Sequence, residues 1–158
     1  MTADPQAANE PPRTARRAPS VGARRFGYVV AILINGVLLY LINVWPTWEV
    51  FPWLTRSTVE VIPWINASII VGMIANVLYL FYDRRWFKAI GDLVTTSVGL
   101  AAMLQLWEVF PFDFGDLAVP WALLTRILIG LAIVGSAIAI VVQVVILVRE
   151  IVRLGRDR

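Results

Sequence analysis

Four long apolar runs, separated by short charged or proline-containing breaks, constrain this chain more than any other feature. A membrane-spanning helix needs about 20 mostly apolar residues to cross a hydrocarbon core about 30 Å thick. The runs cover residues 26–45, 61–82, 89–110 and 127–148, and the helix of the last run can begin near Pro120. They lack the polar–apolar alternation of a transmembrane β-strand. The sequence therefore predicts an all-α polytopic membrane protein with four transmembrane helices.

The composition excludes several kinds of chemistry. Hydrophobic residues make up 59% of the chain, and neither cysteine nor histidine occurs. A soluble enzyme is excluded, as are disulfides, Cys/His metal sites and nucleophiles built on cysteine or histidine. The sequence also contains no nucleotide-binding or catalytic motif. We therefore expect no enzymatic activity, no cofactor and no metal ion.

The basic residues predict the orientation of the spans. The chain holds 14 Lys and Arg against 11 Asp and Glu, a net charge of +3. On one side of the predicted membrane lie only Arg56 and Arg126. The other twelve lie on the opposite side: Arg13, Arg16, Arg17, Arg24, Arg25, Arg84, Arg85, Lys88, Arg149, Arg153, Arg156 and Arg158. By the positive-inside rule, both termini and the middle loop are cytoplasmic in a bacterial plasma membrane. The charge indicates topology and attraction to anionic lipids, and we expect no nucleic acid partner.

The spans group into hairpins with two tails. Residues 1–23 are rich in Pro, Ala and Arg and predict a disordered, basic cytoplasmic tail. Residues 24–83 form a first transmembrane hairpin, and residues 84–150 form a second. Residues 151–158 form a short basic cytoplasmic tail.

The two hairpins share a sequence pattern. Trp-Glu-Val-Phe-Pro at residues 48–52 recurs at residues 107–111, and Ile-Pro-Trp at 62–64 has a counterpart in Val-Pro-Trp at 119–121. In each copy the preceding span opens with a double arginine. The pattern predicts an internal duplication of parallel repeats, related by an axis along the membrane normal. Two such hairpins are expected to assemble as a four-helix bundle.

The repeated motif predicts an outer rim. Six of the seven tryptophans fall at the predicted outer side, namely Trp45, Trp48, Trp53, Trp64, Trp107 and Trp121, and such residues are typical of an aromatic belt at the membrane surface. A sharper interpretation makes Trp48, Glu49, Trp107, Glu108 and Arg126 a rim that holds a lipid, a quinone-like ring or a partner helix.

The charged residues of this rim could also have other roles. Glu49 and Glu108 occupy equivalent places and could bind a cation or share a proton if they meet. Arg126 can extend to the headgroups or pair with Glu108, Asp113 or Asp116.

Polar residues within the spans form a second candidate site. Asp92 is the main one, because an ionisable group inside a span is costly and signals function by default. Its structural interpretation is an interfacial acid paired with Lys88 one turn earlier. The complete set, expected to point inward, is Asn35, Asn76, Asp92, Thr96, Ser136 and Gln143. These residues could line a polar pathway or serve as hydrogen-bonded glue between helices, and the absence of a continuous charge relay favours glue.

Small residues beside Asp92 predict a helix contact. Gly91, Thr95 and Gly99 follow one another at four-residue spacing on the third span. Such a row lets a neighbouring helix approach closely. We therefore expect this side of the third span to face the bundle interior.

Three segments carry a resemblance to a known group of proteins. They are Gly-Asp-Leu-Val-Thr-Thr at residues 91–96, Trp-Glu-Val-Phe-Pro-Phe-Asp-Phe at 107–114 and Trp-Ala-Leu-Leu at 121–124. The chain resembles small four-span integral membrane proteins of actinobacteria that carry no assigned activity. The resemblance covers about residues 24–150, implies membrane placement and transfers no functional residue.

Three functional hypotheses remain. The first is a structural or accessory component of a membrane complex, self-paired or bound to larger partners. The second is a small transporter or channel subunit that uses the polar residues around Asp92. The third is a lipid- or quinone-interacting membrane enzyme, in which Asp92 and Glu108 would have to act.

Overall fold

Four long α-helices make up most of the structure, a computed structural model that describes residues 20–115 and 120–156. The helices are α1 (Val21–Asn43), α2 (Thr58–Phe81), α3 (Arg85–Val109) and α4 (Trp121–Arg156), and a short 3₁₀ helix, η2, covers Trp48–Val50. All four are long and apolar enough to cross a membrane. The prediction of an all-α polytopic protein with four packed transmembrane helices is confirmed.

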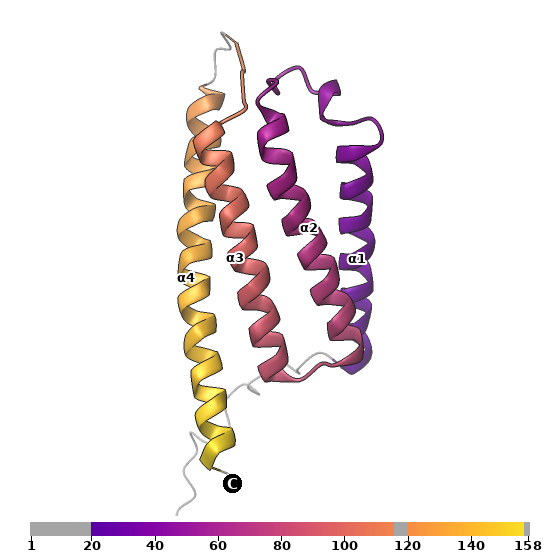
Figure 1. Cartoon of the computed structure of the whole chain (residues 1–158), viewed down its shortest axis with the longest axis vertical. Helices are drawn as coiled ribbons and strands as arrows, with labels where there is room; N and C mark the ends of the chain where they lie inside the picture. The colour runs from indigo at the N-terminus through magenta and orange to yellow at the C-terminus, as the bar shows by residue number, and fades with distance from the viewer. Residues whose placement is uncertain (1–19, 116–119, 157–158) are drawn as a thin grey trace, which may run out of the picture.

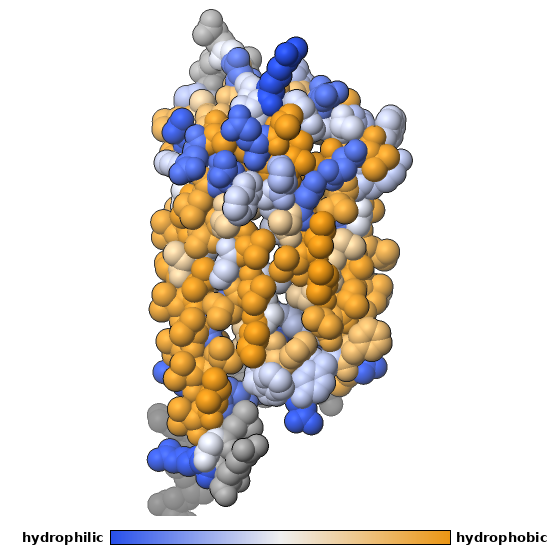
Figure 2. Space-filling view, in the orientation of Figure 1, coloured by the Kyte–Doolittle hydropathy of each residue, from blue (hydrophilic) through white to orange (hydrophobic). Residues whose placement is uncertain are grey.

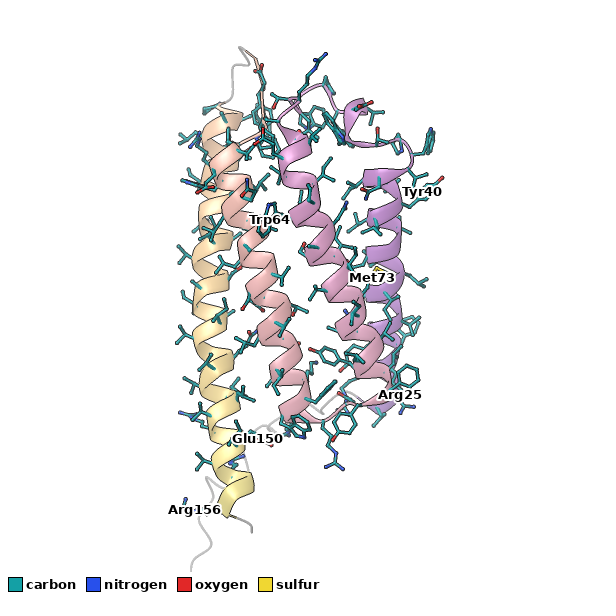
Figure 3. The ribbon with its side chains drawn as sticks, in the orientation of Figure 1. Arg25, Tyr40, Trp64, Met73, Glu150 and Arg156 are labelled. Atoms are coloured by element: carbon teal, nitrogen blue, oxygen red, sulfur yellow. The ribbon has the colours of Figure 1, made fainter. Side chains whose placement is uncertain are left out.

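The bundle is an open layer (Figure 1). Its helix–helix contacts join α1 to α2, α2 to α3 and α3 to α4, and within the described residues α1 does not pack against α4. We call the end of the layer that contains η2, where α1 and α3 finish, the loop end. We call the opposite end, where α1 and α3 begin and α2 and α4 finish, the basic end. Figure 3 shows Arg25, Glu150 and Arg156 at the basic end.

The layer exposes apolar side chains rather than enclosing them. Figure 2 shows a band of hydrophobic atoms over the middle of one face, with hydrophilic atoms gathered toward the two ends. Few side chains are buried, and the most enclosed include Val61, Ala102 and Tyr79, which are 0%, 1% and 4% exposed. Lipid is the solvent that such surfaces require. Helix packing therefore places only a thin core between neighbouring helices.

Two helices extend beyond the predicted spans. Helix α1 begins at Val21 because the Ser20 hydroxyl accepts a hydrogen bond from the backbone N–H of Ala23 at 3.2 Å. The last residues of the predicted N-terminal tail are thus helical, and residues 1–19 lie outside the described residues. Helix α4 continues to Arg156, so most of the predicted C-terminal tail is helix as well.

Backbone hydrogen bonds connect the two hairpins at the loop end. The N–H of Thr55 donates to the carbonyl of Pro111 at 3.0 Å, and the N–H of Asp113 donates to the carbonyl of Trp53 at 2.9 Å. They form an antiparallel β-bridge between Leu54 and Phe112. The loops that follow the two copies of the repeated motif therefore pair directly.

The two copies of the motif themselves adopt different structures. The first copy contains η2, which stands apart from α1, whereas Trp107 to Val109 form the last turn of α3. Pro63 lies inside α2, and Pro120 directly precedes α4. A proline inside a helix removes one backbone hydrogen bond, whereas one before the first turn costs none. The duplication stays a prediction.

Candidate functional site

A series of hydrogen bonds crosses all four helices near the basic end. On the α1 side, the Arg24 guanidinium donates from Nε to Asp83 Oδ2 at 2.9 Å, and the Tyr28 hydroxyl donates to Asp83 Oδ1 at 3.1 Å. Asp83 lies in the turn between α2 and α3. Its carboxylate therefore fixes the start of α1 to that turn.

Tyr79 continues the series from α2 to α3. Its hydroxyl donates to Asp92 Oδ1 at 2.9 Å and also lies 3.1 Å from the carbonyl oxygen of Lys88. The hydroxyl has one proton, and a carboxylate is the stronger acceptor. The Tyr79 ring is buried and lies 5.6 Å from the Tyr28 ring, centroid to centroid. Tyr79 is thus the centre of the polar network.

Lys88 does not form the expected ion pair with Asp92 in the described structure. Its ammonium lies 5.3 Å and 5.8 Å from the ring centroids of Tyr28 and Tyr79, and donates to the Tyr28 hydroxyl at 3.4 Å. The negative faces of the two rings attract the cation. The interpretation of Asp92 as the partner of Lys88 is therefore wrong. Asp92 accepts a hydrogen bond from Tyr79, and the Lys88 ammonium lies over the two tyrosine rings.

Thr96 and Gln143 carry the series from α3 to α4. The Thr96 hydroxyl donates to the backbone carbonyl of Asp92 at 2.7 Å, and Gln143 Nε2 donates to Thr96 Oγ1 at 3.0 Å. This geometry fixes the orientation of the Gln143 amide, since the Thr96 proton is already used. Gln143 Oε1 is buried and has no hydrogen-bond donor among the described residues.

Gly91 makes room for the Tyr79 side chain. A Cβ atom at this position would overlap the Tyr79 hydroxyl and lie 2.9 Å from two of its ring carbons. The close approach predicted for the small-residue row therefore occurs at Gly91. Gly99 differs, because a Cβ there would meet nothing within 4 Å.

The structure brings together three of the six predicted inward polar residues, namely Asp92, Thr96 and Gln143. Asn76 donates to the carbonyl of Gly72 in its own helix at 2.7 Å. Asn35 faces Gly72 across the α1–α2 contact. Ser136 is half-buried and makes no hydrogen bond to a described residue. The six residues do not form one connected series.

Four participants, Arg24, Tyr28, Tyr79 and Asp83, were not among the predicted site residues. A tyrosine near the end of a span is typical of an interfacial anchor. Its sequence position alone therefore does not indicate that its hydroxyl donates a hydrogen bond to another part of the fold. A usable signal is spacing. Tyr28 lies four residues after Arg24, which places both side chains on one side of α1. The amides of Asn43 and Asn66 also pair reciprocally, at 3.0 Å and 2.7 Å, closer to the loop end.

The predicted outer rim divides into two parts. Arg126 lies over aromatic rings, with its guanidinium carbon 4.2 Å from the Phe110 centroid and 5.7 Å from the Trp107 centroid. It forms no ion pair with a carboxylate of the described residues, and Asp116 lies outside them. Trp107 also packs against Gly130, at 3.5 Å from the position of an added Cβ. This part of the rim joins α3 to α4.

Trp48 belongs to the other part. It lines an apolar pocket of about 380 Å³ between α1, α2 and the paired loops, together with Pro46, Phe51, Val61 and Pro111. Among the described residues, no three His, Cys, Asp or Glu side chains gather as a metal site requires, and neither Glu49 nor Glu108 forms an ion pair. The cation or shared-proton interpretation of the two glutamates therefore gains no geometric support.

The fold and its polar network define an all-α membrane protein in which four successive helices are joined side by side. Comparison of the chain with known protein families, characterised proteins and solved structures finds no match.

Proposed function

We propose that this chain is a non-enzymatic integral protein of the bacterial plasma membrane and a structural or accessory component of a membrane complex. The open layer carries the proposal. Helix packing is concentrated between neighbours in the chain, which leaves apolar side chains exposed on α1 and α4, such as Leu33 and Leu131, which are 63% and 64% exposed. An open layer offers long helix faces to a second copy or to a larger partner.

The polar network supports a structural role. Asp83, Tyr79 and Asp92 bind side chains from neighbouring helices, which is the expected arrangement for polar glue in a membrane. Each such hydrogen bond contributes about 1 kcal/mol to helix association. Their common effect is to hold the two hairpins together at the basic end.

The assembly itself is testable. Protein extracted from native membranes with a lipid-retaining polymer is expected to form particles that contain more than one protein chain, as measured by mass photometry. A particle with a single copy and no other protein would contradict the proposal. The alternative is a transporter subunit, because Asp92 borders a cleft at the basic end. Ion flux in proteoliposomes that Asp92→Asn abolishes would favour that alternative.

We also propose that the basic end faces the cytoplasm, where anionic lipids attract it. The support is the distribution of Lys and Arg, because in the ranges that the structure describes only Arg56 and Arg126 lie at the loop end. Both hairpin loops then face outward.

Cysteine labelling tests this orientation, because the chain contains no cysteine. Arg56→Cys at the loop end is expected to react with a membrane-impermeant maleimide on intact cells. Arg156→Cys at the basic end is expected to react only after the membrane is permeabilised. Both positions are exposed, so accessibility to the reagent is matched. The reverse pattern would overturn the orientation.

A further inference from the structure

A cleft of about 400 Å³ lies between the beginning of α3 and the last turns of α4, at the basic end. Its deep part is bordered by Asp92 and Gln143, and its walls by Ala89 and Ile146. The cleft shares Asp92 and Gln143 with the network described above, which connects them to Tyr79 and Thr96.

Positive charge dominates the mouth of the cleft. Arg85 and Lys88 come from α3, and Arg149 and Arg153 come from α4, against only two acidic side chains, Asp92 and Glu150. The Lys88 ammonium lies over the Tyr28 and Tyr79 rings, so the cations left to the cleft are the three arginines of this lining. None of the three arginines forms an ion pair with a carboxylate in the described ranges. The cleft is thus a site whose charge calls for an anion.

The beginning of α3 increases this demand. Its first turn contains Arg85 and no acidic residue, and the N-cap residue Arg84 makes no side-chain capping hydrogen bond. Cations at a helix N-terminus oppose the helix dipole. An anion between α3 and α4 would relieve both this repulsion and the repulsion between the arginines of the two helices.

We propose that this cleft binds the headgroup of an anionic phospholipid with two phosphates joined by a hydroxyl-bearing glycerol, as in cardiolipin. The three arginines, which come from both helices, can bind the two phosphates of such a headgroup. Basic pockets between transmembrane helices on the cytoplasmic side are suited to such headgroups. The proposal deepens the proposed function, because it rests on the basic end lying at a membrane surface.

The surroundings of the cleft favour a lipid over a free phosphate ion. Below the arginines, α4 presents Val142 and Val145, which are 50% and 42% exposed. These side chains continue the apolar wall begun by Ile146 into the lipid-facing surface of the helix. Acyl chains of a lipid bound at the cleft can therefore remain in the bilayer.

The experiment compares lipids around the intact chain. Full-length protein is reconstituted in nanodiscs of phosphatidylcholine with added cardiolipin, or with phosphatidylglycerol at equal total charge, and retained lipid is measured by native mass spectrometry. We expect cardiolipin to be retained in preference to phosphatidylglycerol. In the double variant Arg149→Gln/Arg153→Gln, we expect retention to weaken about 30-fold, because each arginine at such a surface contributes about a fivefold factor.

The matched control is Arg25→Gln/Arg156→Gln. It removes the same charge from the same end of the layer, but neither residue lines the cleft. The preference for cardiolipin over phosphatidylglycerol is expected to survive in this control. Equal loss of that preference in both double variants would reduce the effect to general surface attraction and overturn the site.

Inorganic phosphate provides the remaining arm. If phosphate alone, added to protein in neutral detergent, raises the melting temperature as much as cardiolipin does, the ligand is a free anion and the lipid assignment is wrong. Nanodiscs carry the same lipids in both leaflets, so the result does not depend on orientation. Failure of the lipid experiment would not change the assembly and labelling results. Failure of the assembly or labelling experiment would not change the evidence for this site.

Discussion

Replacement of Gly91 by alanine is expected to lower the free energy of unfolding by about 1–3 kcal/mol, the usual cost of overfilling a packed contact. The added methyl group would overlap the Tyr79 hydroxyl and ring. Tyr79 would have to leave the α2–α3 contact, and its hydrogen bond to Asp92 would break. Unfolding in mixed micelles with increasing dodecyl sulfate measures the loss.

Gly99→Ala is the control on the same helix. A methyl group there meets nothing within 4 Å, so only the higher helix propensity of alanine remains, which stabilises by up to about 1 kcal/mol. The two substitutions are expected to change stability in opposite directions. Equal effects at both positions would mean that the close approach at Gly91 is not a constraint on the fold.

Removal of the Tyr79 hydroxyl is the second substitution with a large expected effect. Tyr79→Phe preserves the buried ring but deprives Asp92 of the donor that lies 2.9 Å from its carboxylate. A carboxylate inside the layer without that donor is costly, and we expect a loss of about 1–2 kcal/mol in the same unfolding experiment.

Tyr82→Phe and a double substitution control this result. Tyr82 directly follows α2, is 39% exposed and makes no hydrogen bond through its hydroxyl to a described residue, so its loss is expected to be close to neutral. Asp92→Ala in the Tyr79→Phe background is expected to add little, because the two residues act as one pair. Fully additive losses would show that Tyr79 and Asp92 are not coupled.

The sequence predicted the helices well because the bilayer imposes their length. The four apolar runs locate α1 to α4 without reference to tertiary contacts. Their arrangement could not be predicted in the same way. An apolar stripe identifies the buried side of a helix in water, but in a membrane both sides of α4 are apolar. The order of the helices in the layer depends on which helices pack against each other. The hydrophobic periodicity of a single helix does not determine this.

The candidate site was predicted only in part, for a related reason. Asp92, Thr96 and Gln143 stand out because they are polar where the neighbouring residues are apolar. Tyr28 and Tyr79 do not stand out, since a tyrosine suits an interface without any partner. Arg126 shows the same limit. Charge rules favour a carboxylate partner, whereas the end of α3 offers the faces of Phe110 and Trp107.

Hydrogen bonds join the two hairpins at both ends of the layer. At the loop end the N–H of Thr55 donates to the carbonyl of Pro111, and near the basic end the Tyr79 hydroxyl donates to Asp92. Two points of attachment so far apart prevent α2 and α3 from sliding lengthwise past each other. The molecule should therefore behave as a stiff plate. When the bilayer becomes thinner, such a plate meets the change by tilting as one unit, with all its helices inclined together.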